Sequence, residues 1–320
     1  MKKQKGITLV ALIVTIILLL IIAGVSINTL IGNDGILQKT TKAKETYELA
    51  QENEKETINQ IEKQYLFNTG ELKEGVYSSE TGLIYKTLTE AIEKTTNGTI
   101  ILCEDIIENI TISEEKNIEI NLNGKTLMGY VKILGKSRIY SGKINNNAGN
   151  ATTIIAVQDG ECTIENVEVE NVRKNNAIKV SGGILNFINS SSIQKYGEGG
   201  QHPIWVQKGT LNIYGGLIQL DTGETGGEAI DGEKESIINI YDGIILNLCG
   251  GKAITTGGVL NIYGGTIHSN SIDKAATVRI ENTGSMNFVK GTIINENESS
   301  YTYYDYAINE KHAGGTWTKE

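Results

Sequence analysis

Proline, arginine, cysteine and phenylalanine are all scarce in this chain of 320 residues. Pro203 is the single proline, and there are three cysteines and three phenylalanines. The cysteines, Cys103, Cys162 and Cys249, are odd in number and widely spaced, which argues against a disulfide framework and a cysteine-based metal site. The formal net charge of −9 argues against nucleic acid as a partner. We therefore expect neither a metal nor another cofactor.

Glycine, by contrast, is abundant, with 37 residues. Together with many Ile, Asn and Thr residues, this composition favours short strands joined by tight turns over a helical protein. One phrase also recurs in the second half of the chain. It reads GTLNIYGGLI at 209–218, SIINIYDGII at 236–245 and GVLNIYGGTI at 258–267.

The phrase is one unit of a longer repeat. Its third letter aligns residues at intervals of 22 to 27, namely Ser137, Cys162, Leu185, Leu211, Ile238, Leu260 and Met286. Within a unit, Leu211 and Ile213 point one way and Asn212 and Tyr214 the other. Two further short strands fit into each unit, the third beginning near Ala229. Three strands per turn predict a mainly β protein, a parallel β-helix whose coils bury each other's inner faces. In such a stack Cys162 is a small buried hydrophobe.

The start of the stack is also visible in the sequence. Residues 87–98, TLTEAIEKTTNG, predict a short amphipathic helix with a capping box from Thr87 to Glu90 and a stop at Gly98. Alternating strands, TIILCEDIIENITI and NIEINLNGKTL, follow it. This pattern resembles the capping helix and first coils of pectin-lyase-like right-handed β-helix proteins. We expect the β-helix with its N-terminal capping helix to span 86–300 and residues 301–320 to cover the last rung.

The N-terminus predicts a membrane anchor. Lys2, Lys3 and Lys5 precede a stretch without any charge from Gly6 to Asn33. This apolar stretch is long enough to cross a bilayer of roughly 30 Å as one helix, which we place at residues 7–33. Basic residues on the short side keep the N-terminus cytoplasmic and the C-terminal domain extracellular, as in a single-pass protein of the cell membrane. A plain, uncleaved anchor is one interpretation of this segment.

A second interpretation comes from residues 2–27, KKQKGITLVALIVTIILLLIIAGVSI. This segment resembles the cleavage and methylation segment of type IV prepilins and pseudopilins. The resemblance implies a leader at 1–6, cleavage after Gly6 by a prepilin peptidase, methylation of Ile7, and other pilin-like subunits as partners. Ala11 stands where the family usually has a Glu that pairs with a neighbouring subunit. The resemblance therefore supports cleavage and membrane anchoring more strongly than it supports assembly into a filament.

Residues 34–68 predict a helical stalk beyond the anchor. They are dense in Lys, Glu, Gln and Ala, and from Ile36 to Leu66 they contain neither Gly nor Pro. Apolar residues are sparse, so this helix buries little by itself. We expect residues 69–85 to form a linker between the stalk and the β-helix.

The sequence gives little sign of catalysis. Polysaccharide cleavage on this fold needs paired carboxylates or a basic group with Ca²⁺-binding carboxylates, and the chain has no Asp-Asp pair. Weak candidates for catalytic residues lie in the longer loops, which adjacent rungs bring side by side. These residues are Lys195, His202, Asp221, Glu224 and Asp231. The alternative is that these are solvated loop residues. Asp221, Glu224 and Glu228 match no repeat-encoded calcium motif.

A row of tyrosines and asparagines is the stronger candidate for binding. We expect Tyr140, Tyr214, Tyr241 and Tyr263 to form one row and Asn186, Asn212, Asn239, Asn261 and Asn287 a parallel row on the same outward face. Such rows provide a platform and hydrogen-bond partners for sugar rings. The alternative is that like-on-like ladders simply stabilise neighbouring rungs. We therefore expect a membrane-anchored, prepilin-like surface protein whose β-helix serves adhesion or carbohydrate binding. The other hypotheses are a cell-surface polysaccharide lyase or glycoside hydrolase and a purely structural spacer.

Overall fold

The computed structural model describes residues 9–31, 36–145, 153–171, 175–194, 202–222, 227–272, 275–306 and 308–320. The chain divides into two compact units, Met1–Leu66 and Phe67–Glu320. Gly6 and Ile7, the predicted processing residues, lie outside the described ranges.

The first unit is helical. Helix α1 (Leu9–Ile31) contains no charged residue, and helix α2 (Ile36–Asn68) covers the predicted stalk. In α1 the side chains of residues 11–27 are all exposed. Among the residues described, no helix combines the length and the apolarity needed to cross a membrane. The coarse prediction of helices before the β domain is confirmed.

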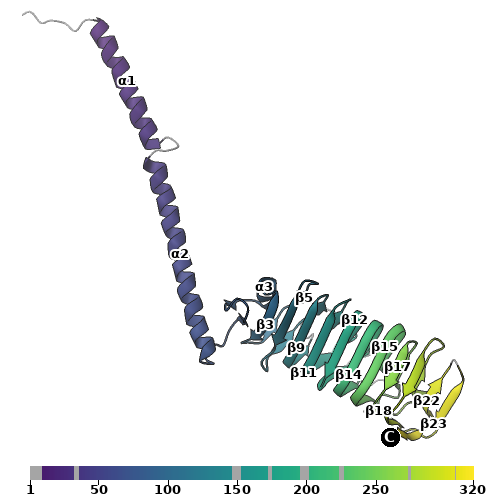
Figure 1. Ribbon diagram of the computed structural model, residues 1–320. Helices are drawn as coiled ribbons and strands as arrows, with labels where there is room; N and C mark the ends of the chain where they lie inside the picture. The colour runs from purple at the N-terminus through teal and green to yellow at the C-terminus, as the bar shows by residue number, and fades with distance from the viewer. Residues whose placement is uncertain are drawn as a thin grey trace, which may run out of the picture. The chain divides into compact units, whose positions relative to one another are not determined.

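The second unit is a β-solenoid of about 7 turns, and Figure 1 shows its strands lying side by side from β3 to β22. Each full turn contributes to three faces, and strands of neighbouring turns pair in parallel. The first face contains β3 (Asn97–Leu102), β6 (Asn117–Asn121), β17 (Val259–Ile262), β20 (Ser285–Phe288) and parts of the long strands β9 (Lys136–Asn145), β11 (Glu161–Asn171), β12 (Ile178–Ile188), β14 (Ile204–Leu220) and β15 (Glu228–Asn247).

The other two faces are built in the same way, and the long strands pass through the corners into them. The second face adds β4 (Ile106–Ile107), β7 (Thr126–Met128), β13 (Ser190–Gln194), β18 (Thr266–Ser269) and β21 (Gly291–Asn295). The third face adds β5 (Ile110–Ile112), β8 (Val131–Ile133), β10 (Ile155–Val157), β16 (Lys252–Thr256), β19 (Ala276–Ile280) and β22 (Tyr301–Asp305).

The predicted inner column is present on the first face. Register pairs each member with the next in the order Ser137, Cys162, Leu185, Leu211, Ile238, Leu260 and Met286. A second column two residues further on includes Phe187, Ile213 and Ile240, all buried. Cys162 is completely buried, as predicted, and burial raises the pKa of its thiol to about 12. The stacked apolar columns are the core, and each fully buried aliphatic side chain contributes about 1.5–3 kcal/mol.

The Gly-Gly pair of the repeated phrase makes the corner between the first and second faces. Gly215 and Gly216 both have positive φ, 134° and 100°, which L-residues with a side chain rarely adopt. A Cβ on Gly216 would lie 2.0 Å from the carbonyl oxygen of Ser190 in the rung before it. Glycine therefore recurs at this corner because the backbone of the preceding rung lies too close to leave room for a side chain.

Helix α3 (Leu88–Lys94) lies at the N-terminal end of the stack (Figure 1) and buries Leu88, Ala91 and Ile92. Thr87 is its N-cap, and its hydroxyl accepts from the Glu90 amide at 3.1 Å, as predicted. The predicted stop at Gly98 is wrong. The helix ends at Lys94. Gly98 lies beyond it in β3, where it pairs with Ile118 in the next rung.

Two short strands lie in the segment expected to be a linker. Strand β1 (Val76–Ser78) pairs antiparallel with β2 (Ile84–Tyr85) and with β3, so the β structure begins before residue 86. Val76 is fully buried in the core. Burial of this apolar side chain explains why the segment is ordered instead of forming a free connection.

The opposite end is covered by the last residues of the chain. Strands β23 (Glu310–Ala313) and β24 (Gly315–Lys319) pair antiparallel with β22 and β21. The Trp317 ring lies edge-on against Phe288 at 4.7 Å and stacks on His312 at 4.0 Å. The parallel stack itself continues to Asp305, because β22 pairs with β19.

Candidate functional site

Tyr214, Tyr241 and Tyr263 form a stack on the outward side of the first face. Ring centroids are 4.7 Å apart for the first pair and 5.2 Å for the second, with interplanar angles of 2° and 14°. The three residues are 43%, 41% and 38% exposed. Because neighbours cover both faces of the Tyr241 ring, this residue offers its edge and hydroxyl to solvent. A sugar ring cannot lie flat on Tyr241, so a ligand here contacts ring edges.

Tyr140 lies in the same row but outside the stack. It pairs with Glu165, and Glu165 pairs with Ile188, so two rungs without tyrosine separate it from Tyr214. Its ring lies against the Arg138 guanidinium, 4.3 Å from the ring centroid. Tyr140 therefore occupies the predicted row, but only Tyr214, Tyr241 and Tyr263 stack on one another.

The asparagines form a continuous hydrogen-bonded ladder beside the tyrosine stack. Nδ2 of Asn212 donates to Oδ1 of Asn186 at 2.9 Å, and the same bond recurs from Asn239 to Asn212 and from Asn261 to Asn239, both at 2.8 Å. Asn287 follows in register. The like-on-like contacts that stabilise neighbouring rungs are thus present in both rows. We call these asparagines, Asn186 to Asn287, and the three stacked tyrosines the Asn–Tyr strip.

A second cluster lies where the third face begins, around the buried side chain of His202. Its Nδ1 lies 3.1 Å from the carbonyl oxygen of Glu228 and 3.6 Å from Oε2 of the same residue. Its Nε2 lies 3.6 Å from Oδ2 of Asp231. Because a carbonyl only accepts, Nδ1 carries the proton, and in neutral His202 the lone pair of Nε2 faces Asp231.

The two carboxylates of this cluster have different surroundings. Oε1 of Glu228 pairs with Lys252 Nζ at 2.7 Å. Burial raises the pKa of Asp231. The negative charges of Glu228 and Glu233 raise this pKa further, whereas His202 and Lys252 lower it. The Asp231 side chain is 29% exposed and the His202 side chain 6%. The cluster therefore places a carboxyl with a raised pKa and an ion-paired carboxylate around one histidine, an arrangement suited to acid–base chemistry.

Only part of the predicted loop group comes together. His202 and Asp231 meet, as expected from adjacent rungs, whereas Asp221 is exposed and takes no part in the described contacts of the cluster. Lys195 and Glu224 lie outside the described residues. Within the described ranges, no group of three or more His, Cys, Asp or Glu residues is arranged to hold a metal ion.

Sequence reasoning missed Glu228 as a partner of His202 and Lys252 as the ion-pair partner of Glu228. The signal that identifies them is the recurring Ala-Ile pair at 177, 229 and 253, which starts the third face. The residues before these pairs, Asn176, Glu228 and Lys252, lie in one column along the solenoid. Within it, Glu228 pairs in register with Lys252, and the backbone amide of His202 donates to Oδ1 of Asn176. Asp231 directly follows the pair Ala229-Ile230, and its register partners in the neighbouring rungs are Trp205 and Thr255.

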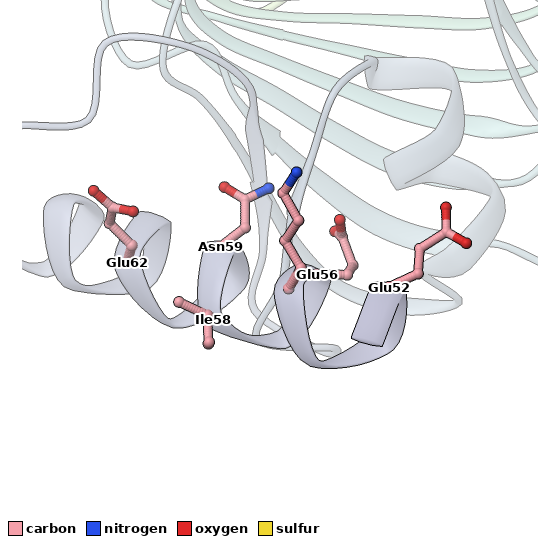
Figure 2. A pocket seen from close by; sticks show the side chains of 6 residues that line it. Glu52, Glu56, Ile58, Asn59 and Glu62 are labelled. Atoms are coloured by element: carbon pink, nitrogen blue, oxygen red, sulfur yellow. The ribbon is translucent and has the colours of Figure 1, made fainter. Parts of the chain in front are cut away.

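Helix α2 also carries a hollow on its surface. Glu62 and Asn59 extend to one side of the helix and Ile58 extends away from them (Figure 2). All residues that line the hollow come from this one helix, namely Glu52, Lys55, Glu56, Ile58, Asn59 and Glu62. Such a surface lacks the convergent walls of a ligand pocket.

Comparison with known proteins identifies no relative, because no family model, curated protein or solved structure matches the chain.

Replacing Asp231 with asparagine should stabilise the solenoid near neutral pH. A carboxyl whose pKa is raised in the folded state stabilises the fold below its ordinary pKa of 3.8, and this contribution is lost as the pH rises through the elevated value. The neutral amide avoids that loss. We expect the Asp231→Asn variant to melt roughly 2–4 °C higher near neutral pH and to match the wild type at about pH 3. An equal gain at both pH values in thermal unfolding would contradict a raised pKa.

Proposed function

We propose that this protein is a membrane-anchored surface protein whose solenoid binds carbohydrate through the Asn–Tyr strip. The observation that carries the proposal is the strip itself, a hydrogen-bonded amide ladder beside exposed tyrosine edges on one outward face. Amides and phenol groups are typical hydrogen-bond partners of hydroxyl-rich ligands, and the aromatic edges provide apolar contact.

The anchor in this proposal is the stretch without charge from Gly6 to Asn33, which follows the three lysines of the leader. Processing follows the prepilin-like route, with cleavage after Gly6 and methylation of Ile7, so that a prepilin peptidase and pilin-like subunits are partners. The N-terminus is cytoplasmic and the solenoid extracellular. The right-handed sense of the coil belongs to the same proposal, in line with the pectin-lyase-like resemblance.

A triple replacement of Tyr214, Tyr241 and Tyr263 with serine tests carbohydrate binding. The three rings are surface groups, so the variant should fold while losing the exposed aromatic edges. We expect it to lose at least about tenfold in affinity for the glycans that the wild type retains on an array, equivalent to about 1.4 kcal/mol. The matched control is Tyr140→Ser, which removes a tyrosine of the same row outside the stack and should bind as the wild type does. An unchanged binding profile in the triple variant would contradict the proposal.

The His202 cluster favours a second candidate function, glycoside hydrolysis. Asp231 would be the general acid, Glu228 would be the base or nucleophile, and His202 contacts both. The Trp205 side chain beside Asp231 would provide apolar contact for a sugar ring.

Release of reducing ends from a panel of polysaccharides tests this second function. If the wild type is active, Asp231→Asn and Glu228→Gln should each lower kcat at least about a hundredfold, because each removes a proton-transfer group. The control is Asp221→Asn, which should keep full activity because Asp221 lies outside the cluster. No release of reducing ends by the wild type would leave binding as the function, and equal activity in all variants would exclude the His202 cluster as the catalytic site.

A further inference from the structure

The first face changes its chemistry partway along the solenoid. In the early rungs its outward side chains are charged and paired. Lys136 Nζ lies 3.0 Å from Glu161 Oε2, and Arg138 contacts Glu165 at 2.7 Å and Glu119 at 3.4 Å. These pairs run between neighbouring rungs, so each cation in this part of the face is paired with a carboxylate.

From Ile184 onward the same outward rows contain a single charged residue, Asp242, which pairs in register with Tyr214 after a bulge in β15. In the five rungs formed by β12, β14, β15, β17 and β20, the rows contain Ile184, Asn186, Ile188, Thr210, Asn212, Tyr214, Ile237, Asn239, Tyr241, Val259, Asn261, Tyr263, Ser285, Asn287 and Val289. The chain as a whole carries a formal charge of −9. With one charged residue among its outward positions, this part of the face differs clearly from the N-terminal part, where Glu119, Lys136, Arg138, Glu161 and Glu165 are all charged.

The amide ladder runs along the middle of this part of the face, between two apolar borders. Ile237 and Val259 on one side are 41% and 39% exposed, and the stacked tyrosines form the other side. An asparagine amide has two N–H groups and two lone pairs, and the ladder bonds use one of each at Asn212 and Asn239. The second N–H and lone pair recur once per rung, about every 4.8 Å along the solenoid axis.

We propose that the ligand of the Asn–Tyr strip is a neutral, linear polysaccharide that lies along the solenoid axis. This inference rests on the proposed function and specifies its ligand class. A hydroxyl-rich neutral chain matches the amide groups of the ladder and buries no unpaired charge against the two apolar borders. A polyanionic chain lacks cationic partners there and is repelled by the net negative charge of the protein.

The axial direction follows from the geometry of the ladder. Along a strand, the outward positions change from Ile237 through Asn239 to Tyr241, whereas along the axis asparagine recurs in five successive rungs and tyrosine in three. A polymer of identical units finds identical groups only along the axis. A ligand that crossed the face along a strand would contact one asparagine amide, with the row of Ile237 and Val259 on one side and the tyrosine row on the other.

Affinity electrophoresis of the full-length protein in detergent tests the ligand class. The probes are hydroxyethylcellulose as a neutral polymer and polygalacturonate as an anionic one. We expect retardation by the neutral polymer that is insensitive to salt, and no retardation by polygalacturonate. Equal or stronger retardation by polygalacturonate would overturn the neutral class. If the Tyr214, Tyr241 and Tyr263 serine variant also lost that retardation, carbohydrate binding by the strip would stand.

Two variants at one position separate charge from the loss of a ladder bond. Asn239→Asp places a carboxylate in the middle of the ladder, and Asn239→Ala breaks the same bonds without adding charge. We expect affinity for hydroxyethylcellulose to fall at least about tenfold in Asn239→Asp but at most about threefold in Asn239→Ala. Glu161→Gln, in the charged part of the face, is the control and should bind normally. Equal losses in the two Asn239 variants would overturn the proposal.

Binding of neither polymer, with no glycan retained on an array, would contradict both the ligand class and the proposed function. Self-association through this face is the remaining outcome. It would appear as a dimer of the solenoid in light scattering that Ile237→Lys dissociates, and it would also overturn the proposal. Circular dichroism of each variant shows whether the β-solenoid is intact.

Discussion

We expect the Phe187→Ala variant to lose about 3–5 kcal/mol of unfolding free energy. Phe187 is among the largest completely buried side chains, and it lies in an inner column between Ile164 and Ile213 of the adjacent rungs. Removing the ring leaves a cavity that the neighbouring rungs cannot close, because their backbones are fixed by parallel pairing on both sides.

Urea unfolding followed by circular dichroism measures this loss. The matched control is Ile184→Ala in the same strand, since Ile184 points outward and is 39% exposed. Surface substitutions of this kind change stability by about 0.5 kcal/mol or less. If both variants lost the same amount, the inward and outward assignment of β12 would be wrong.

Removal of residues 310–320 should cause the solenoid to associate end to end. Strands β23 and β24 cover the edges of β22 and β21, and the Trp317 ring covers Phe288. Without them the last rung presents unpaired backbone groups and apolar side chains, which are a template for another chain. We expect end-to-end oligomers and a lower melting temperature.

Size-exclusion chromatography with light scattering measures the association. The control is Trp317→Phe, which keeps both covering strands and an aromatic ring against Phe288 and should leave the oligomeric state unchanged. A truncated chain with the oligomeric state and melting temperature of the wild type would show that β23 and β24 do not protect the end.

The inner column was predictable because one phrase recurs with its apolar letters in fixed places. Each coil has to bury Leu211, Ile238 or Leu260 against the next, so the alignment of the phrases is also the register of the strands. The corner glycines follow from the same alignment, because the close approach of successive rungs repeats at every turn.

The parts that escaped prediction depend on what lies between repeats. Tyr140 fits the tyrosine row by its letter, but the intervening Glu165 and Ile188 break the vertical contact that stacking needs. Gly98 looked like a helix stop, but pairing between β3 and β6 takes it into the sheet. These residues come from turns of different length, so loop spacing alone did not place Glu228 beside His202 or Lys252 beside Glu228.

Disulfide trapping tests the stacked register most directly. A disulfide needs Cα atoms within about 7 Å, and paired parallel strands lie about 4.8 Å apart. Asn212 and Asn239 pair in adjacent rungs, whereas Asn212 and Asn261 are two rungs apart. With Cys249 replaced by serine to leave only buried native thiols, the Asn212→Cys, Asn239→Cys double variant should form the bond on oxidation, as detected by mass spectrometry. The Asn212→Cys, Asn261→Cys variant should not. Bond formation in the second variant and none in the first would contradict the solenoid.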